Sequence, residues 1–354
     1  MAVPDRSPLA ERLTAQLLAG EPARDPVAVA ERLLAVQGQD PRGARLAVRA
    51  RTLGTGTTAA DVERAFTDDR ALLISWLNRG TLHLVRSEDY PWLHALTTPP
   101  LVTGCARRLA QEGVPAADVE RAVEAIGRAL ADEGPLTREQ LRDRIAAAGV
   151  RTEGQALVHL LMTASLQGLC VRGPMIGARH AFGLVRDWLG EEALRPVDRD
   201  AALAELARRY LVGHGPASDR DLARWAGLPL RDARAGLAAI ATELVERTDG
   251  LVDIARRPAG PAAELPPPRL LGAFDPLLLG WTSREDVLGE HVDSGIVTDN
   301  GLFRPFALVR GRAVATWRLA AGTVTLDSFA PLPRRVAIAL DQDAADVKRF
   351  LGLP

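Results

Sequence analysis

Residues 33–42 read Leu-Leu-Ala-Val-Gln-Gly-Gln-Asp-Pro-Arg, and this stretch decides how the N-terminal helices follow one another. An apolar helix that begins at Pro26 and extends to Gln37 runs into a glycine and then a second glutamine, Gln39. On a continuous helix, side chains two positions apart point about 200° apart, so the two glutamines would not serve one site. We therefore expect the helix to break here, so that both amides converge on one point.

The residues next to Gln39 supply the means for such a break. Gly38 frees the backbone, Asp40 is a preferred N-cap, and Pro41 fits the first position of a new helix that runs to about residue 52. Asp40 has a second interpretation, as a catalytic carboxylate. Its place directly before a proline favours the cap.

Basic side chains follow the corner at helical spacing. Arg42, Arg45 and Arg49 stand at i, i+3 and i+7 and form one positively charged stripe. Two converging amides beside such a stripe indicate a polar reaction site next to a track for phosphates. The alternative is that the glutamines cap helix ends and the arginines form a solvated face. Spacing alone favours the alternative, because Gln-x-Gln is a short motif.

Bulk composition describes an ordinary soluble globular protein. The chain has 354 residues, enough for two or three domains, with 47% hydrophobic and 25% charged residues. Its formal net charge of −1 supplies no global attraction to nucleic acid, so any DNA surface must come from local segregation of charge. Lys348 is the single lysine, which leaves it and the α-amino group as the amines for catalysis.

The sequence predicts no metal and no cofactor. Cys105 and Cys170 are isolated, and no two histidines form an i, i+4 pair with an acidic partner, so a zinc site is not expected. The N-terminus has no cationic-then-apolar leader and the chain has no apolar span of membrane length. We expect a cytoplasmic protein without a membrane partner, associated with the bacterial nucleoid through its substrate.

A unit of short helices followed by a hairpin occurs three times in tandem. Three such helices with a β-hairpin are the winged-helix module, and a repeat argues for an array built from one supersecondary unit. Winged helices also serve as protein–protein adaptors, which is the structural alternative. The first hairpin turns at Asn78-Arg79-Gly80, and a capping box, Thr137 with Gln140, starts a helix of the second unit. The predicted modules are residues 1–98, which contain the Gln-x-Gln motif, 99–195 and 196–257.

A proline-rich linker, residues 258–268, precedes a C-terminal region of strands. Apolar segments at 270–274, 277–281, 306–309, 313–318 and 323–326 predict a small antiparallel β domain, residues 269–354, closed by a helix from 333 to 351. The turn Arg310-Gly311-Arg312 places two cations at a hairpin tip. It has two interpretations of equal weight: a probe that enters a DNA groove, or a solvent-facing turn.

Together these residues resemble the HTH_42-type winged-helix DNA glycosylases, whose best-described members unhook bulky alkylation crosslinks from DNA. The family's signature, Gln-apolar-Gln or Gln-x-Asp between N-terminal helices, is matched by Gln37-Gly38-Gln39. Residues 79–85 (Arg-Gly-Thr-Leu-His-Leu-Val) look like its first wing, and 273–280 and 316–318 match its C-terminal segment. The resemblance covers essentially the whole chain. Gly38 departs from it, because the family often has a larger apolar residue there.

The resemblance implies an α+β protein in which three tandem winged helices and the β domain form a C shape around a DNA channel. It implies a monofunctional glycosylase that hydrolyses the N-glycosidic bond of N7-alkylated purines, including crosslinks made by an azinomycin-like agent, as self-resistance and base excision repair. The partner would be double-stranded DNA, bound by a monomer. Gln37 and Gln39 would be catalytic, and the candidate DNA contacts are Arg42, Arg45, Arg49, Arg79, His83, Arg310, Arg312 and Arg318.

The amide pair fits this chemistry. Glycosidic cleavage normally needs an acid for the leaving group and a carboxylate near the oxocarbenium-like transition state. An N7-alkylguanine is already cationic and leaves as a neutral base, so what remains is to aim a water at C1′ and to stabilise the developing cation. The rival from another class is a DNA-binding regulator without catalysis. Regulators of this fold usually carry one module and dimerise, which three modules in one chain suit poorly.

Overall fold

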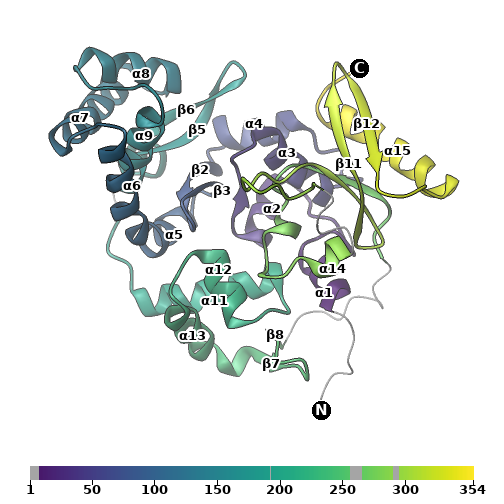
Figure 1. Cartoon of the computed structure of the whole chain (residues 1–354). Coiled ribbons are helices and arrows are strands. Elements are labelled where there is room, and N and C mark those ends of the chain that lie inside the picture. The colour runs from purple at the N-terminus through teal and green to yellow at the C-terminus, as the bar shows by residue number, and fades with distance from the viewer. Residues whose placement is uncertain (1–7, 192, 256–264, 290–294) are drawn as a thin grey trace. The chain divides into compact units, whose positions relative to one another are not determined.

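The computed structural model describes residues 8–191, 193–255, 265–289 and 295–354 (Figure 1). The chain divides into two compact units, one made of residues 1–62, 203–225 and 229–354 and the other of residues 63–202 and 226–228. Both mix α-helices with antiparallel strands, which confirms the α+β class. Residues 258–264 of the predicted linker lie outside the described residues. None of the helices in the described ranges is long and apolar enough to cross a membrane.

The first unit begins with short helices whose starts are set by proline and an acidic cap. The side chain of Asp25 accepts a hydrogen bond from the Ala28 amide at 2.7 Å, and Pro26 takes the first position of the second helix. That helix ends at Leu33, four residues before the predicted end. The elements are α1 (Pro8–Ala15), α2 (Pro26–Leu33), β1 (Val36–Gln37), α3 (Pro41–Arg51) and α4 (Ala59–Thr67), the last of which continues into the second unit.

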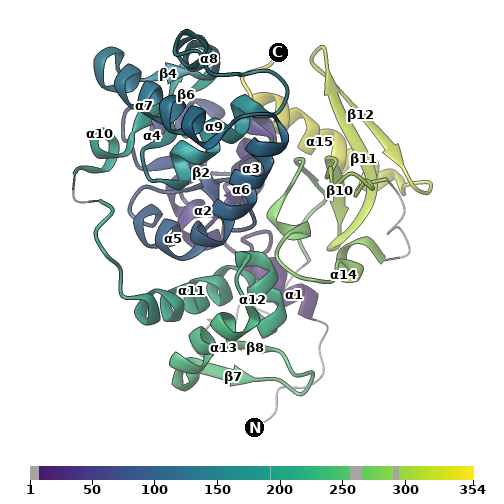
Figure 2. The same ribbon diagram turned by 60° about the vertical axis from the view of Figure 1, so that its left-hand side comes forward.

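The second unit is built around an antiparallel sheet of strands in the order β3-β2-β5-β6-β4. The hairpin β2–β3 closes with Leu77 opposite Thr81, which confirms the predicted turn, and Thr137 and Gln140 form the predicted capping box. Pairing of Ile74 with Arg172 joins the first two predicted hairpins into this one sheet. Helices α7 and α8 lie near β4 and β6, and α9 packs against α7 and contacts β2 and β5 (Figure 2). The elements are β2 (Leu72–Leu77), β3 (Thr81–Arg86), α5 (Tyr90–Thr97), α6 (Pro99–Gln111), α7 (Ala116–Glu133), β4 (Leu136–Thr137), α8 (Arg138–Ala147), α9 (Ala156–Leu166), β5 (Cys170–Ile176), β6 (Arg179–Leu184) and α10 (Val185–Leu189).

The third predicted group of helices and a hairpin is present. Leu244–Glu246 pairs with Val252–Ile254, with Leu244 opposite Ile254, across a turn that contains Asp249 and Gly250. The elements are α11 (Arg199–His214), α12 (Asp219–Ala226), α13 (Leu230–Ala239), a short 3-10 turn η1 (Ala241–Glu243), β7 (Leu244–Glu246) and β8 (Val252–Ile254).

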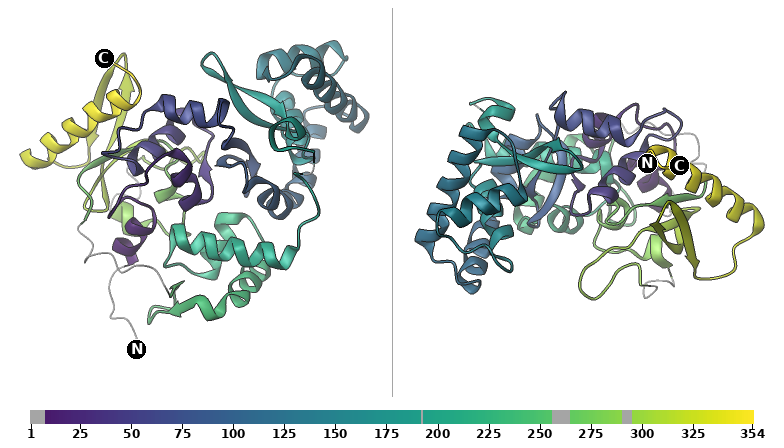
Figure 3. Two further views of the ribbon diagram at one scale, coloured as in Figure 1. Left: turned by 180° about the vertical axis from the view of Figure 1, so that it is seen from behind. Right: turned by 90° about the horizontal axis from the view of Figure 1, so that it is seen from above.

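The C-terminal part of the first unit is a sheet of order β12-β11-β10-β9 with a helix along it (Figure 3). Its core joins Leu270, Ala315, Trp317, Leu340 and Val347 to Leu46 of α3. The expected strand at 277–281 is wrong, because Asp275 caps a 3-10 turn there by accepting from the Leu277 amide at 2.9 Å. The elements are β9 (Arg269–Leu271), η2 (Pro276–Leu278), α14 (Glu285–Leu288), β10 (Phe306–Val309), β11 (Arg312–Ala320), β12 (Thr323–Ser328) and α15 (Arg334–Phe350).

Candidate active site

The break before the Gln-x-Gln motif is a turn at Leu34. This residue has φ 63° and ψ −46°, and the Ala35 amide donates to the Leu33 carbonyl at 2.7 Å, which makes the strained form of the γ-turn. A non-glycine residue held in this region costs on the order of 1–3 kcal/mol. The expectation that Gly38 would supply the break is therefore corrected, since Leu34 is the residue with positive φ at this corner.

Packing from α11 holds the end of α2 in place. A Cβ on Gly213 would lie 2.3 Å from the Arg32 carbonyl oxygen, so only glycine permits this approach of the two helices. Arg209 adds a hydrogen bond from Nη2 to the Glu31 carbonyl at 2.6 Å, which satisfies one of the carbonyls left open at a helix end. The strained turn thus starts from a fixed helix.

The two glutamines converge, as predicted. Nε2 of Gln37 donates to Oε1 of Gln39 at 2.7 Å. Gln37 is buried, with 6% of its surface exposed, whereas Gln39 is exposed. Across the part of the chain that the structure describes, Oε1 of Gln37 and Nε2 of Gln39 make no hydrogen bond. Oε1 of Gln37 is not sealed from solvent, and Gln39 is an exposed residue. An acceptor and a donor are therefore available side by side to a water or a substrate atom.

Asp40 is the N-cap of α3, which confirms the preferred of its two interpretations. Its Oδ1 accepts from the Gly43 amide at 2.6 Å, and Pro41 takes the first helical position. The carboxylate is thereby held by the helix end, where the helix dipole favours a negative charge. This bond also fixes the chain directly after Gln39, so the amide pair stands on a rigid helix start.

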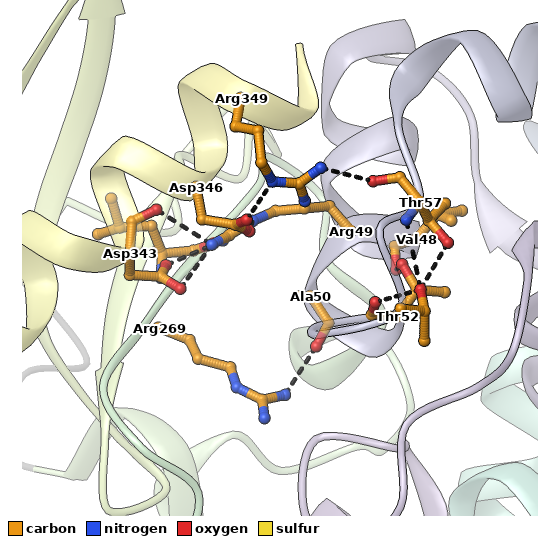
Figure 4. Close-up of polar contacts among 11 residues, drawn as sticks. Val48, Arg49, Ala50, Thr52, Thr57, Arg269, Asp343, Asp346 and Arg349 are labelled. Atoms are coloured by element: carbon orange, nitrogen blue, oxygen red, sulfur yellow. Dashed lines mark hydrogen bonds and ion pairs between the residues drawn. The ribbon is translucent and has the colours of Figure 1, made fainter. Parts of the chain in front are cut away.

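Two of the three arginines in the α3 stripe are buried, so the expectation of a continuous phosphate track is corrected. Arg42 is exposed, but Arg45 is buried and donates from Nη1 to the Pro41 carbonyl at 3.0 Å. Arg49 is 1% exposed and binds Asp343 at 2.9 Å and Asp346 at 2.8 Å, both on α15 (Figure 4). Because their guanidinium groups are taken up inside the protein, Arg45 and Arg49 are not retained as DNA contacts.

A second buried arginine, Arg51, was not singled out by the sequence. It and Asp275 are both fully buried and share two hydrogen bonds, of 2.9 and 3.0 Å. Arg51 also donates to the Gln16 carbonyl and to the Gln16 side chain, at 2.9 and 2.8 Å. The signal that would have pointed here is a lone aspartate, Asp275, inside an apolar segment. This network ties the last turn of α3 to the segment before η2 and to Gln16, the residue that follows α1.

Gly43 brings the backbone of α3 against the segment after β9. A Cβ on Gly43 would lie 2.3 Å from the Ala273 carbonyl oxygen, and one on Gly272 would lie 2.9 Å from the Gly43 Cα. Exchange of glycine for alanine inside a helix normally stabilises by up to about 1 kcal/mol. At Gly43 it would instead push two backbones apart, and α3 carries the motif at its start.

We therefore expect Gly43→Ala to lower the free energy of unfolding by about 1–3 kcal/mol, the usual cost of overpacking. The matched control is Gly104→Ala, because Gly104 lies in α6 and a Cβ there meets nothing within 4 Å. That control should be neutral or stabilising in the same urea unfolding measured by circular dichroism. Equal effects of the two substitutions would contradict the close contact.

Comparisons with known proteins identify the family. The family model described as "DNA glycosylase AlkZ-like" matches residues 30–350. The chain belongs to this family. It is a DNA glycosylase, which decides against the regulator and adaptor interpretations. It is 28% identical, over 98% of its own length and 96% of the relative's, to the Interstrand DNA cross-link repair glycosylase of Streptomyces sahachiroi. The solved structure of Streptomyces sahachiroi DNA glycosylase AlkZ matches with a TM-score of 0.78 and 26% identity, over 98% of this chain and 96% of that one.

Two candidate DNA contacts of the glycosylase lie in the second unit, on the hairpin β2–β3. Arg79 is half-buried in the turn. His83 is buried, and its Nδ1 lies 2.9 Å from the Thr81 carbonyl oxygen. Burial first and the charge of Arg79 second lower the pKa of His83 to about 3, so the imidazole is neutral at physiological pH. His83 is therefore not retained as a DNA contact, since it offers neither charge nor exposure.

The remaining candidates lie on the C-terminal sheet. Arg310 and Gly311 have φ of 52° and 81° and form the predicted tight turn, with both arginines exposed. The turn itself packs on α1, since a Cβ on Gly311 would lie 2.9 Å from Cδ1 of Leu13. Arg318 is exposed on β11, opposite Thr325 of β12. Of all the sequence candidates, the structure brings Gln37, Gln39 and Arg42 together at the start of α3.

Proposed function

We propose that this glycosylase hydrolyses the N-glycosidic bond of N7-alkylated purines in duplex DNA and leaves an abasic site. The observation that carries the proposal is the hydrogen bond between Gln37 and Gln39, which leaves one amide acceptor and one amide donor open to solvent. The substrates include interstrand crosslinks of the kind made by an azinomycin-like agent. The name of the Streptomyces sahachiroi relative, a cross-link repair glycosylase, supports this part.

The protein does not have to protonate the leaving base. Alkylation at N7 gives the purine a positive charge, so the base departs neutral and needs no general acid. Oε1 of Gln37 accepts a hydrogen bond from the attacking water and aims it at C1′. As the bond from C1′ to the base breaks and the bond from C1′ to the water oxygen forms, the water's proton passes to bulk solvent. The bond from Gln37 to Gln39 fixes the acceptor, and the second lone pair of the Gln39 oxygen can face the cationic sugar.

Selectivity follows from the neutrality of the pair. Positioning of this kind lowers a barrier by several kcal/mol, on the order of the gains known for oriented reactants. That is enough for a glycosidic bond already weakened by a cationic base. An undamaged nucleoside also requires leaving-group protonation, which amides do not supply. The enzyme should therefore act on cationic lesions and leave ordinary purines intact.

The proposed DNA contacts are the exposed or half-exposed arginines of both units. In this proposal one monomer binds the duplex, and three winged helices line the DNA channel. Full flipping of a crosslinked base would drag the base of the opposite strand with it, so the lesion is read within a distorted duplex. Phosphate contacts of this type position the duplex and make binding salt-dependent. These arginines are Arg42, Arg79, Arg310, Arg312 and Arg318.

The product distinguishes hydrolysis from lyase chemistry. A duplex carrying one N7-methylguanine should show more strand breaks after incubation with the enzyme and brief heating in alkali than the same duplex treated without enzyme, and none without alkali. Borohydride should trap no covalent complex, because Lys348 lies on α15 and no lysine stands in the motif. Breaks before alkali treatment would refute the hydrolytic proposal, and an absence of breaks after alkali would refute activity on this lesion.

A further inference from the structure

A pocket of about 380 Å³ lies directly after the amide pair, within the first unit. One side is lined by the start of α3, with its cap Asp40, Pro41, Arg42, Gly43 and Leu46. Ala273, Pro305, Trp317 and Leu319 line it from the C-terminal part. Asp40 follows Gln39 in the chain, and consecutive Cα atoms are about 3.8 Å apart, so the pocket begins within one residue of the amide pair. The mechanism proposed above makes no use of this space.

The walls of the pocket are fixed by packing and hydrogen bonds. The Trp317 indole is held by a hydrogen bond from Nε1 to the Leu271 carbonyl at 2.8 Å and belongs to the core shared by the sheet, α15 and Leu46. The backbone contact of Gly43 with Gly272 sets the distance between the two sides. The pocket is therefore preformed and does not depend on a side chain moving out.

The residues that line the pocket suit a ligand that has an apolar group and, next to it, a polar group. Alanine, proline, leucine and the indole supply apolar and aromatic surface, whereas the two charged side chains stand on the α3 side. Oδ1 of Asp40 is engaged with the helix end, so the exposed Arg42 is the charged group open to a ligand. A volume of about 380 Å³ lies in the range of small-molecule sites and far exceeds the needs of a methyl group.

We propose that this pocket receives the bulky apolar or aromatic substituent that the damaged purine carries on N7. The inference rests on the proposed function, because it takes the reacting sugar to lie at Gln37 and Gln39. Burial of the substituent contributes binding energy remote from the reacting bond, which orients C1′ against the held water. The pocket then sets a preference for bulky lesions over methyl lesions.

The test places a larger side chain in the pocket at Leu319, a lining residue that is half-buried. Leu319→Trp adds volume at a lining position on β11, and Val324→Trp is the control, because Val324 lies opposite Leu319 on β12 and does not line the pocket. The substrates are two duplexes, one with N7-methylguanine and one with an N7-guanine adduct of a naphthyl epoxide. For each protein the readouts are kcat/KM on both substrates, affinity for the undamaged duplex and thermal midpoint.

Leu319→Trp should lower the ratio of kcat/KM for the naphthyl adduct to that for N7-methylguanine by at least about tenfold, as hydrophobic pockets discriminate by this order. Val324→Trp should leave the ratio unchanged. If Leu319→Trp fails to fold, Leu319→Phe gives the same comparison with a smaller insertion. An unchanged ratio in a folded variant overturns the pocket assignment. Failure of the wild-type enzyme on both substrates overturns the proposed function instead, so the two failures are distinguishable.

Discussion

Gln37→Ala should lower the rate of excision of an N7-alkylguanine by about two to three orders of magnitude, the usual cost of removing one positioned group from a reaction site. The substitution removes the acceptor that holds the water, and it also removes the donor that orients Gln39. Gln39→Ala should have a smaller or equal effect, because Gln37 keeps its acceptor. The double substitution should cost little more than Gln37→Ala alone, since residues that act as one unit are not additive. Single-turnover excision assays measure all three.

The controls separate chemistry from folding and from DNA binding. Affinity for an undamaged duplex, measured by fluorescence anisotropy, should stay nearly unchanged in every variant, because the glutamine side chains are not among the proposed phosphate contacts. Gln39→Glu should retain far more activity than Gln39→Ala, since a carboxylate oxygen still accepts from Nε2 of Gln37 and adds a charge that stabilises the sugar cation. A parallel loss of excision and of duplex affinity would assign the pair a structural or purely binding role.

The parts of the site that sequence predicted depend on local signals. Asp40 directly before Pro41 predicts a helix N-cap from neighbouring residues alone, and the structure has this cap at the start of α3. The exclusion of a continuous helix predicts that the two glutamines serve one site, and their side chains are hydrogen-bonded to each other. The sequence points to Gly38 as the residue that breaks the helix, whereas the turn is at Leu34. A leucine with positive φ carries no sequence signal, because this conformation persists only when the surrounding structure enforces it.

The parts that sequence did not predict depend on partners far along the chain. Arg49 and its partner Asp343 are 294 positions apart. The spacing of arginines on a helix is the same whether they face water or carboxylates from a distant part of the chain, so the sequence does not distinguish the two cases. The apolar run at 277–281 likewise fits a strand or a buried turn equally well. The turn forms because the Asp275 side chain accepts a hydrogen bond from the Leu277 amide. Pairing of Ile74 with Arg172, which merges two hairpins into one sheet, is also non-local.

Asp275→Ala should lower the free energy of unfolding by about 3–5 kcal/mol, because it leaves the Arg51 charge buried without its carboxylate. Both side chains are fully buried, and Asp275 also caps the turn at Leu277, so the substitution removes a cap as well. The loss should appear as a lower urea midpoint in circular dichroism. Since Arg51 lies in α3, excision of N7-alkylguanine should fall at temperatures where the wild-type enzyme is still fully active.

Two comparisons test whether the buried charge is the cause. Replacing both partners, Arg51→Met with Asp275→Leu, should destabilise less than Asp275→Ala alone, because no unpaired charge then remains in the interior. Glu133→Gln, which removes the exposed pair with Arg144, should leave the midpoint almost unchanged, since solvent screens such pairs. If the double variant lost as much as the sum of Arg51→Met and Asp275→Leu measured singly, the coupling energy of the pair would be zero. The loss in Asp275→Ala would then come from the missing cap and the lost packing, and not from a buried cation left without its carboxylate.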